Sequence, residues 1–242
     1  LSNVRVNFAP VCDIRYPDSN IVVGDRSFGA ADDVRRMAKL FCQAFENNGV
    51  HTTLKHFPGH GPSKLDSHER KAVLFKSKRE LMKEDTILFS QLAEDASAIM
   101  TAHIGFEGEE GLPFSINANL FNDFKDHLPP NKILFTDDVQ SMKAVADLKP
   151  WVEAMKLPYD FVLLCGTLDQ AASSIEEAIR FWEDSSTSFS KEQEWEKKVK
   201  KSESHFVSTE KLLPFQDWKL RMMDLEREGL DLIQGLSSVN QS

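Results

Sequence analysis

The chain has 242 residues, of which 41% are hydrophobic and 28% are charged. This composition is typical of a folded globular protein and excludes collagen-like, low-complexity and wholly disordered chains. The net charge of −9 argues against a nucleic-acid partner, which requires a basic surface to meet its phosphates. No apolar run approaches the ~20 residues of a membrane-spanning helix, so we expect no membrane span.

Five short apolar runs predict β-strands, and each ends in polar or glycine-containing sequence. In chain order they occupy residues 4–14, 52–57, 98–104, 132–136 and 160–165. Between them lie segments in which apolar residues recur at intervals of three or four, which predicts helices. These segments are 32–47, 77–96 and 168–182. The alternation favours an α/β fold of parallel βαβ units, as in a (β/α)8 barrel or a doubly wound sheet.

Polar residues fall at or just after the carboxyl ends of the predicted strands. They lie in the pairs Cys12-Asp13, Lys55-His56, Ala102-His103 and Asp137-Asp138. In parallel α/β folds the carboxyl ends of the strands form the working face of the protein. The sequence therefore predicts one site built from the ends of several strands.

The two ends of the chain differ from this repeating pattern. The chain begins at Leu1 rather than at Met, and its first predicted strand starts almost at once, so we expect a fragment that lacks its N-terminal segment. After Trp182, a serine-rich linker leads into a charged stretch and then into a segment with helical spacing. We expect a catalytic domain at 1–182, and a charged linker with a helical tail at 183–242.

The three cysteines show neither a CxxC pair nor a cysteine–histidine spacing that would suggest zinc. We interpret Cys12, Cys42 and Cys165 as buried, reduced thiols that pack as small apolar residues. Reduced thiols favour a cytoplasmic location. That location stays open, because any signal peptide or lipid anchor would precede Leu1.

Three of the seven histidines lie within residues 55–68. Asp66 and His68 are two residues apart there, a spacing at which the carboxylate can bond one ring nitrogen and fix the tautomer of the histidine. Such a dyad can donate a proton to a leaving group and later accept one from water. The alternatives are a surface loop with incidental polar residues and a metal site, although no recognised ligand spacing is present.

Two further motifs carry charged groups that suit a binding site. Asp137 and Asp138 directly follow an apolar run, where a carboxylate can serve as a nucleophile, a metal ligand or the N-cap of the next helix. Arg26 lies between glycines in the segment GDRSFG, and its guanidinium can hold a polar substrate group through two parallel hydrogen bonds.

Taken together, these motifs resemble those of glycoside hydrolase family 3. The resemblance is greatest to its β-N-acetylglucosaminidase branch, the single-domain bacterial enzymes of peptidoglycan recycling. The matching segments are NFAPVCD at 7–13, GDRSFG at 24–29, KHFPGHG at 55–61, DSH at 66–68, MTAH at 100–103 and DFVLLC at 160–165. The resemblance implies a (β/α)8 barrel, which would be incomplete here because the chain offers five candidate strands for eight positions.

The resemblance also implies a mechanism, a retaining hydrolysis through a covalent glycosyl-enzyme intermediate. Asp137 would be the nucleophile, His68 the general acid and base, and Asp66 the group that orients His68. Three further side chains would bind sugar hydroxyls: Arg26, Lys55 and His56. The implied partner is a GlcNAc-containing oligosaccharide or muropeptide, and neither a metal nor an organic cofactor is needed.

The sequence departs from the family pattern after the aspartate pair, where 139–142 holds one residue more than usual before the methionine. Aligning from Met142 backwards would select Asp138 as the nucleophile, whereas Val139 keeps Asp137 in register with the strand. We prefer Asp137, since a strand fixes register better than the loop after it.

The alternatives to a retaining β-N-acetylglucosaminidase belong to different classes. One is another family 3 activity, including phosphorolysis, in which phosphate replaces water in the second step. Another is a non-catalytic carbohydrate-binding remnant, and a third is an α/β barrel enzyme with a different reaction. The sequence does not distinguish cell-wall fragments from chitin-type oligomers as substrates.

Overall fold

The computed structural model describes residues 4–17, 25–61, 63, 72–74, 76–107, 111–140, 150–183, 196–197 and 200. The chain divides into two compact units, one formed by Val6–Val207 and the other by Leu1–Arg5 with Ser208–Ser242. Nearly all the described residues belong to the first unit, and the predicted tail at 183–242 lies almost entirely outside them.

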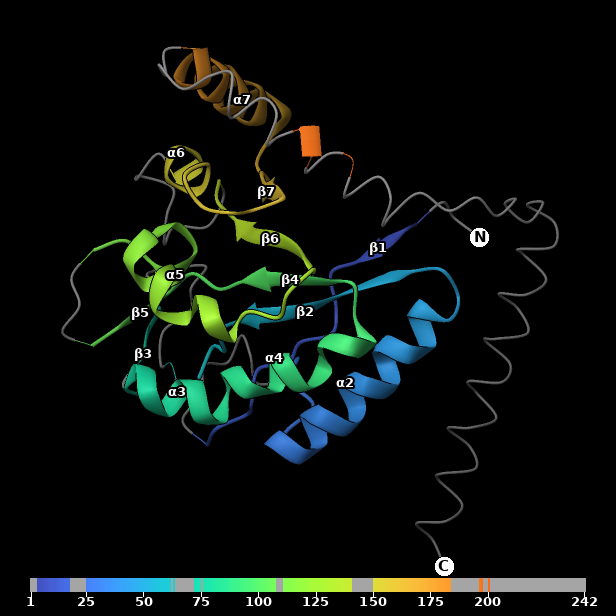
Figure 1. The fold of residues 1–242 in the computed structure, drawn as a ribbon. Helices are drawn as coiled ribbons and strands as arrows, with labels where there is room; N and C mark the ends of the chain where they lie inside the picture. Colours follow the sequence, from blue (N-terminus) through green and yellow to red (C-terminus); the bar gives the residue numbers. More distant parts are fainter. Residues whose placement is uncertain are drawn as a thin grey trace, which may run out of the picture. The chain divides into compact units, whose positions relative to one another are not determined.

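The first unit is built on a five-stranded sheet in which every neighbouring pair of strands is parallel (Figure 1). In sheet order the strands are β1 (Val6–Asn7), β2 (His51–Phe57), β4 (Ala98–Thr101), β6 (Ile133–Asp138) and β7 (Phe161–Leu163). Sequence order and sheet order agree, so the sheet progresses in one direction like half of a barrel. The α/β alternation predicted from the sequence is confirmed.

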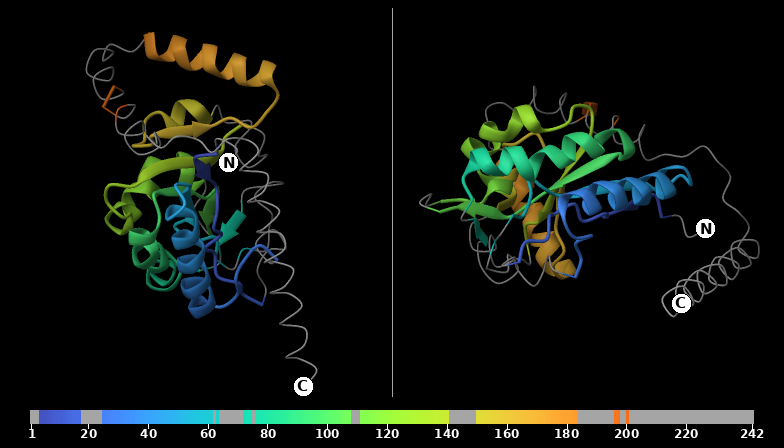
Figure 2. Two further views of the ribbon diagram at one scale, coloured as in Figure 1. Left: turned by 90° about the vertical axis from the view of Figure 1, so that its right-hand side faces the viewer. Right: turned by 90° about the horizontal axis from the view of Figure 1, so that it is seen from below.

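Helices lie between successive strands, and α2 (Ala31–Glu46) and α4 (Thr86–Leu92) pack against the sheet at β2, as two further views show (Figure 2). The other helices are α3 (Lys78–Glu84), α5 (Ala118–Phe124), α6 (Pro150–Ala154) and, after the last strand, α7 (Leu168–Glu183), with short 3-10 turns at Ala93–Asp95, Phe114–Ile116 and Lys125–His127. Val34, Ala38 and Cys42 of α2 are fully buried and belong to the same apolar core as Leu54 of β2. Because these residues recur every four positions, they line one side of α2, and that side packs against the sheet.

The helix predicted at 77–96 is two helices that meet at Asp85, followed by a 3-10 turn. Its predicted start is confirmed, because Ser77 and Glu80 form a reciprocal capping box. A single continuous helix is wrong here, since the buried Asp85 ends α3 and precedes α4 while its carboxylate pairs with Lys76 inside the protein.

Three predicted strands are shorter in the structure than in the sequence pattern, and of the run 160–165 only Phe161–Leu163 form β7. Residues 8–14 run beside β2, where the backbone N–H of Thr53 donates to the carbonyl of Ala9 at 2.9 Å. Pro10 has no N–H, so it interrupts the regular hydrogen bonds of a strand. The run 98–104 divides into β4 and β5 (Ile104–Phe106), and β5 pairs with β3 (Ala72–Leu74) in a separate two-stranded sheet.

The cysteine prediction is confirmed at two positions and wrong at the third. Cys12 and Cys42 are buried, and burial raises the pKa of Cys42 to about 11. Cys165 is exposed, because it follows the last residue of β7 and lies where the strand leaves the sheet. Within the described part of the chain, no helix is both long and apolar enough to cross a membrane.

Candidate active site

The structure brings four of the predicted polar groups together at the carboxyl ends of the strands. Lys55 and His56 are among the last three residues of β2, and Asp137 lies near the end of β6. Asp13 follows the extended segment beside β2 and is fully buried. Parallel strands end at the same edge of the sheet, which places these side chains within reach of one another.

Asp13 and His56 form the most buried polar pair of this cluster. The Nδ1 atom of His56 lies 2.7 Å from Oδ2 of Asp13, and the backbone N–H of His60 donates to Oδ1 of Asp13 at 2.7 Å. Burial opposes the ionisation of Asp13, but its electrostatic interaction and hydrogen bond with His56 outweigh that penalty, so the pKa of Asp13 lies below its usual value. Asp13 is therefore an ionised, hydrogen-bonded carboxylate in the interior.

Asp137 faces the same histidine from the neighbouring side of the site. Its Oδ2 lies 3.8 Å from Nε2 of His56, and its side chain is 22% exposed, so it borders both the cluster and solvent. Burial acts to raise the pKa of Asp137, but electrostatic interactions with His56 and His103 lower it below its usual value. An ionised carboxylate that is partly exposed at a strand end can act as a nucleophile.

Lys55 and Arg26 add positive charge at this edge. Burial lowers the pKa of Lys55, the charge of Arg26 lowers it further, and the charges of Asp137 and Asp13 raise it. Arg26 itself is exposed, in the turn that follows the undescribed residues 18–24. The backbone beside it is fixed, because the hydroxyl of Ser27 donates to the carbonyl of Asp13 at 2.6 Å.

Asp138 is directed away from this cluster, although it adjoins Asp137 in sequence. Its Oδ1 accepts from the backbone N–H groups of Gln140 at 2.9 Å and of Cys165 at 3.0 Å, which ties the end of β6 to the end of β7. Its backbone carbonyl lies 2.7 Å from Nε2 of the buried His103. A carbonyl oxygen only accepts, so Nε2 of His103 carries a proton and donates it.

The predicted dyad of Asp66 and His68 lies outside the described residues, which leave out 64–71. Of the described residues on either side of this segment, Ser63 forms an antiparallel bridge with Leu74.

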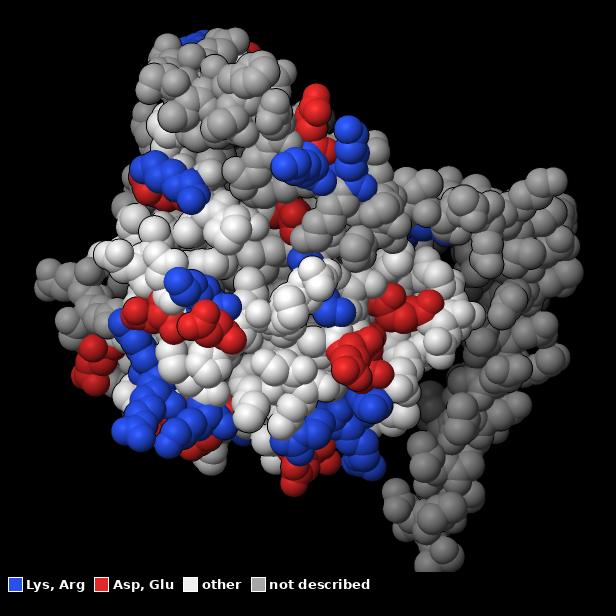
Figure 3. Space-filling model, in the orientation of Figure 1, with Lys and Arg blue, Asp and Glu red and all other residues white. Residues whose placement is uncertain are grey.

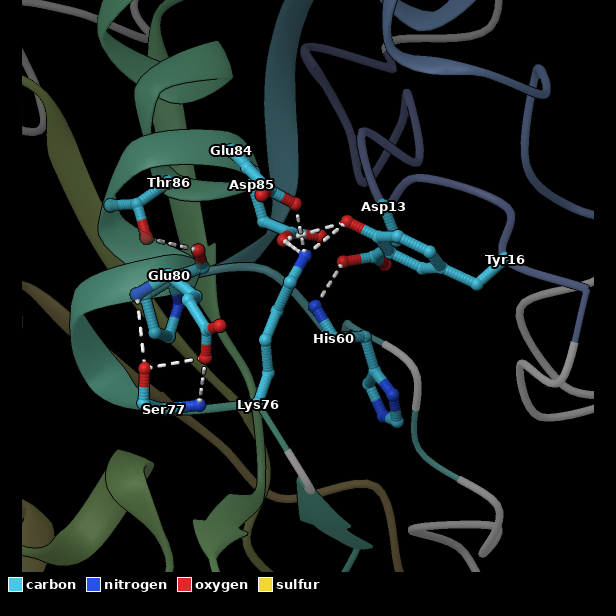
Figure 4. A network of polar contacts seen from close by, with 10 residues as sticks. Asp13, Tyr16, His60, Lys76, Ser77, Glu80, Glu84, Asp85 and Thr86 are labelled. Atoms are coloured by element: carbon cyan, nitrogen blue, oxygen red, sulfur yellow. Dashed lines mark hydrogen bonds and ion pairs between the residues drawn. The ribbon is translucent and has the colours of Figure 1, made fainter.

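A partly buried ion-pair network lies beside the loop that carries His60 (Figure 4). The ammonium of Lys76 lies 2.8 Å from Oδ2 of Asp85 and 2.7 Å from Glu84, and the hydroxyl of Tyr16 donates to Asp85 at 3.0 Å. Gly59 packs directly against Asp85, where a Cβ atom would come within 2.5 Å of the Cβ of Asp85. The junction between α3 and α4 therefore holds the loop after β2 in place.

A polar pocket of about 450 Å³ lies at the opposite ends of the strands and contains none of these groups. Its lining residues are Gln43, Glu46, Asn47, Glu94, Asp95, Ala96, Ser97 and Lys132. Glu46 already accepts from the amides of Thr52 and Ser97, so it joins α2 to the starts of β2 and β4. We interpret this end of the sheet as structural.

Acidic and basic side chains are interspersed on the face shown in Figure 3. Some of the exposed charges are paired, as in Arg35–Asp32 and Lys78–Asp123. Among the residues that the structure describes, no group of three or more histidine, cysteine, aspartate or glutamate side chains could hold a metal ion.

The described residues form a parallel α/β half-barrel sheet, and its carboxyl edge gathers carboxylates, imidazoles and a lysine. Residues 2–163 match the family described as "Glycosyl hydrolase family 3 N terminal domain". The chain belongs to this family, as the motifs in its sequence indicated.

Curated relatives agree with this assignment. The chain is 32% identical over 171 residues to a beta-hexosaminidase of Actinobacillus pleuropneumoniae serotype 5b, which covers 67% of this chain and 49% of the relative. It is likewise 32% identical over 174 residues to a beta-hexosaminidase of Methylobacillus flagellatus, covering 69% of this chain and 50% of the relative. The chain thus spans about half the length of the curated relatives that it matches.

Two solved structures share the fold. A family 3 beta-N-acetylglucosaminidase from Paenibacillus sp. FPU-7 has a TM-score of 0.71 and 25% identity, covering 88% of this chain and 42% of that one. A family 3 glycosyl hydrolase from Mycobacterium smegmatis has a TM-score of 0.69 and 27% identity, covering 85% of this chain and 64% of that one.

Sequence reasoning gave no role to some groups that the structure places in the site. It located Asp13 and His103 at strand ends, but their partners lie 43 and 12 residues away and no local pattern reveals them. It did not single out Asp85, which looked like one polar position of a longer helix. The apolar run before Asp13 was the signal available, and it is the same signal that identified Asp137.

Proposed function

We propose that this protein is a retaining exo-β-N-acetylglucosaminidase that removes terminal β-linked GlcNAc from cell-wall fragments or chitin-type oligomers. The observation that carries the proposal is the position of Asp137, an ionised and partly exposed carboxylate beside His56 and Lys55 in a family 3 chain. The names of the curated relatives support the sugar, because they are beta-hexosaminidases.

In the proposed reaction, Asp137 attacks the anomeric carbon through an oxocarbenium-like transition state and forms a covalent glycosyl-enzyme. His68, oriented by Asp66, protonates the leaving oxygen and then takes a proton from the water that releases the sugar from Asp137. Arg26, Lys55 and His56 bind the sugar hydroxyls. An imidazole as the acid and base avoids the repulsion that a second carboxylate would exert on Asp137.

The contacts of the aspartate pair favour Asp137 over Asp138 as the nucleophile. Asp138 accepts hydrogen bonds from two backbone amides, which lower the nucleophilicity of its oxygen and fix it in the loop. Among the residues that the structure describes, Asp137 accepts one such bond, from the amide of Asp138 at 2.8 Å. The finer fold expectation, that this chain forms part of a (β/α)8 barrel, belongs to this proposal and draws support from the likeness to the Paenibacillus enzyme.

The test measures release of nitrophenol from an aryl β-GlcNAc substrate by the full chain and two variants. We expect Asp137→Ala to reduce kcat by ~10⁴-fold or more, the scale of loss when a member of a covalent catalytic unit is removed. Asp138→Ala, the matched control, should retain measurable turnover with lower stability. An active Asp137→Ala variant beside an inactive Asp138→Ala variant would contradict the assignment.

The product separates hydrolysis from its alternatives. Free GlcNAc with retained anomeric configuration supports the proposal. Release that depends on phosphate concentration and yields a sugar phosphate would identify phosphorolysis instead. Binding of GlcNAc without any turnover would support a non-catalytic carbohydrate-binding role.

A further inference from the structure

Asp13 makes contacts that orient His56 and leave the proposed nucleophile untouched. Its Oδ2 lies 2.7 Å from Nδ1 of His56, and its Oδ1 accepts from the backbone N–H groups of His60 at 2.7 Å and of His56 at 3.3 Å. Asp13 is fully buried, so substrate cannot reach it. Its effect on any bound sugar must pass through the histidine.

The chemistry of these contacts determines where the ring proton of His56 lies. A carboxylate only accepts hydrogen bonds, so the contact at 2.7 Å requires a proton on Nδ1. Nε2 then lies 3.8 Å from Oδ2 of Asp137, too far for a direct hydrogen bond. In the neutral ring Nε2 is an acceptor, placed where a substrate hydroxyl can donate to it beside the nucleophile.

We propose that Asp13 is a positioning residue that holds the Nδ1 proton of His56 and so presents Nε2 to a hydroxyl of the substrate. This inference rests on the proposed function for the identity of that hydroxyl, but the position of the proton is independent of it. Side chains that bind one ring nitrogen of a histidine set the tautomer that the other nitrogen displays.

The variant Asp13→Asn tests this with little change of shape. Two backbone N–H groups point at the Oδ1 position, so the amide oxygen of the new side chain must occupy it. Its NH₂ group then takes the place of Oδ2 and faces Nδ1 of His56. Because an amide NH₂ only donates, Nδ1 must lose its proton and Nε2 must gain one. The substitution therefore inverts the tautomer in the neutral ring.

The readout is long-range ¹H–¹⁵N NMR of histidine-labelled full chain, with His56→Gln identifying the His56 signals. We expect Nδ1 to be protonated in the wild type and unprotonated in Asp13→Asn. The matched control is Asp85→Asn, which also replaces a buried carboxylate but has no hydrogen bond to His56, and it should keep the proton on Nδ1. Turnover of the aryl substrate should fall roughly 10- to 100-fold in Asp13→Asn.

A wild-type spectrum with an unprotonated Nδ1 would overturn the proposal, and so would an Asp13→Asn variant that keeps its Nδ1 proton. The wild-type spectrum decides the matter alone if Asp13→Asn does not fold. A chain that turns over no substrate but shows the expected exchange of tautomer would contradict the proposed function and support the role of Asp13.

Discussion

At Lys76 one ammonium group meets two carboxylates that differ mainly in burial. Glu84 lies 2.7 Å away with a side chain that is 56% exposed, and Asp85 lies 2.8 Å away with a side chain that is 1% exposed. Burial raises the pKa of Asp85 even though Lys76 lowers it, so the buried pair is held against a desolvation cost. Removing either partner of such a pair leaves a buried charge uncompensated.

We therefore expect Asp85→Ala to lower the free energy of unfolding by about 3 kcal/mol, because it leaves Lys76 and Tyr16 without their buried acceptor. Glu84→Ala, the matched control on the same ammonium, should cost less than ~1 kcal/mol, since solvent screens an exposed pair. Urea denaturation measures both values. Equal losses for the two variants would contradict the role assigned to burial.

At the scale of one element, the loop after β2 carries the backbone of His60 to Asp13 and rests on Asp85. Gly59 has φ +118°, and a Cβ atom there would lie 2.5 Å from the Cβ of Asp85. Both facts require glycine, the first through backbone conformation and the second through space. Gly49, after α2, has φ +73° but no heavy atom within 4 Å of the same position, so it shares only the first requirement.

This difference predicts unequal effects of the same substitution. Gly59→Ala should destabilise the protein by about 3 kcal/mol or more, because strain at a disallowed φ adds to a clash that neither backbone can relieve. Gly49→Ala should cost about 1 kcal/mol, the price of a left-handed conformation for alanine. Thermal or urea unfolding of both variants tests the comparison, and a Gly49→Ala loss as large as that of Gly59→Ala would refute it.

The elements show which parts of the fold local sequence can predict. Apolar patterns identified β2, β6 and α2 to within a few residues, because the two strands are almost wholly buried and α2 buries one regular face. The same spacing located α7, although its apolar side chains Leu168, Ile175 and Ile179 are exposed. It did not predict the break at Asp85, since the apolar spacing of the two helices continues through it. Periodicity also missed the pairing of β3 with β5, which depends on contacts between segments some 30 residues apart.

In the candidate site, too, local sequence predicts some residues and cannot predict others. Motif spacing identified Lys55, His56 and Asp137 as charged groups at strand ends, where parallel topology brings them to one edge. The partner of His56 follows from packing in three dimensions, because Asp13 reaches it across a gap of 43 residues. Local sequence can thus predict which charged groups lie at the strand ends, whereas the partners that hold them depend on how the sheet folds.

For the whole molecule, stability at low pH depends on groups that titrate in separate pH ranges. The pKa values of Asp13 and Asp137 lie below 3.8 in the folded protein, so their contribution to stability is present above that value and is lost as the pH falls further. Buried histidines act at higher pH. Burial lowers the pKa of His60 from 6.5 to about 4 in the folded protein, and it also lowers that of His103.

The direction in which His60 changes stability with pH follows from its pKa values in the unfolded and folded states, 6.5 and about 4. Between pH 6.5 and about 4 the unfolded chain binds a proton at His60 that the folded protein does not, so acidification stabilises the unfolded state. The free energy of unfolding should fall by up to ~3 kcal/mol across this range and receive no further contribution from His60 below it. His60→Gln should remove that part of the slope and keep the part due to His103. Urea denaturation at intervals from pH 7 to pH 4 measures both curves, and parallel curves would show that His60 is protonated equally in the two states.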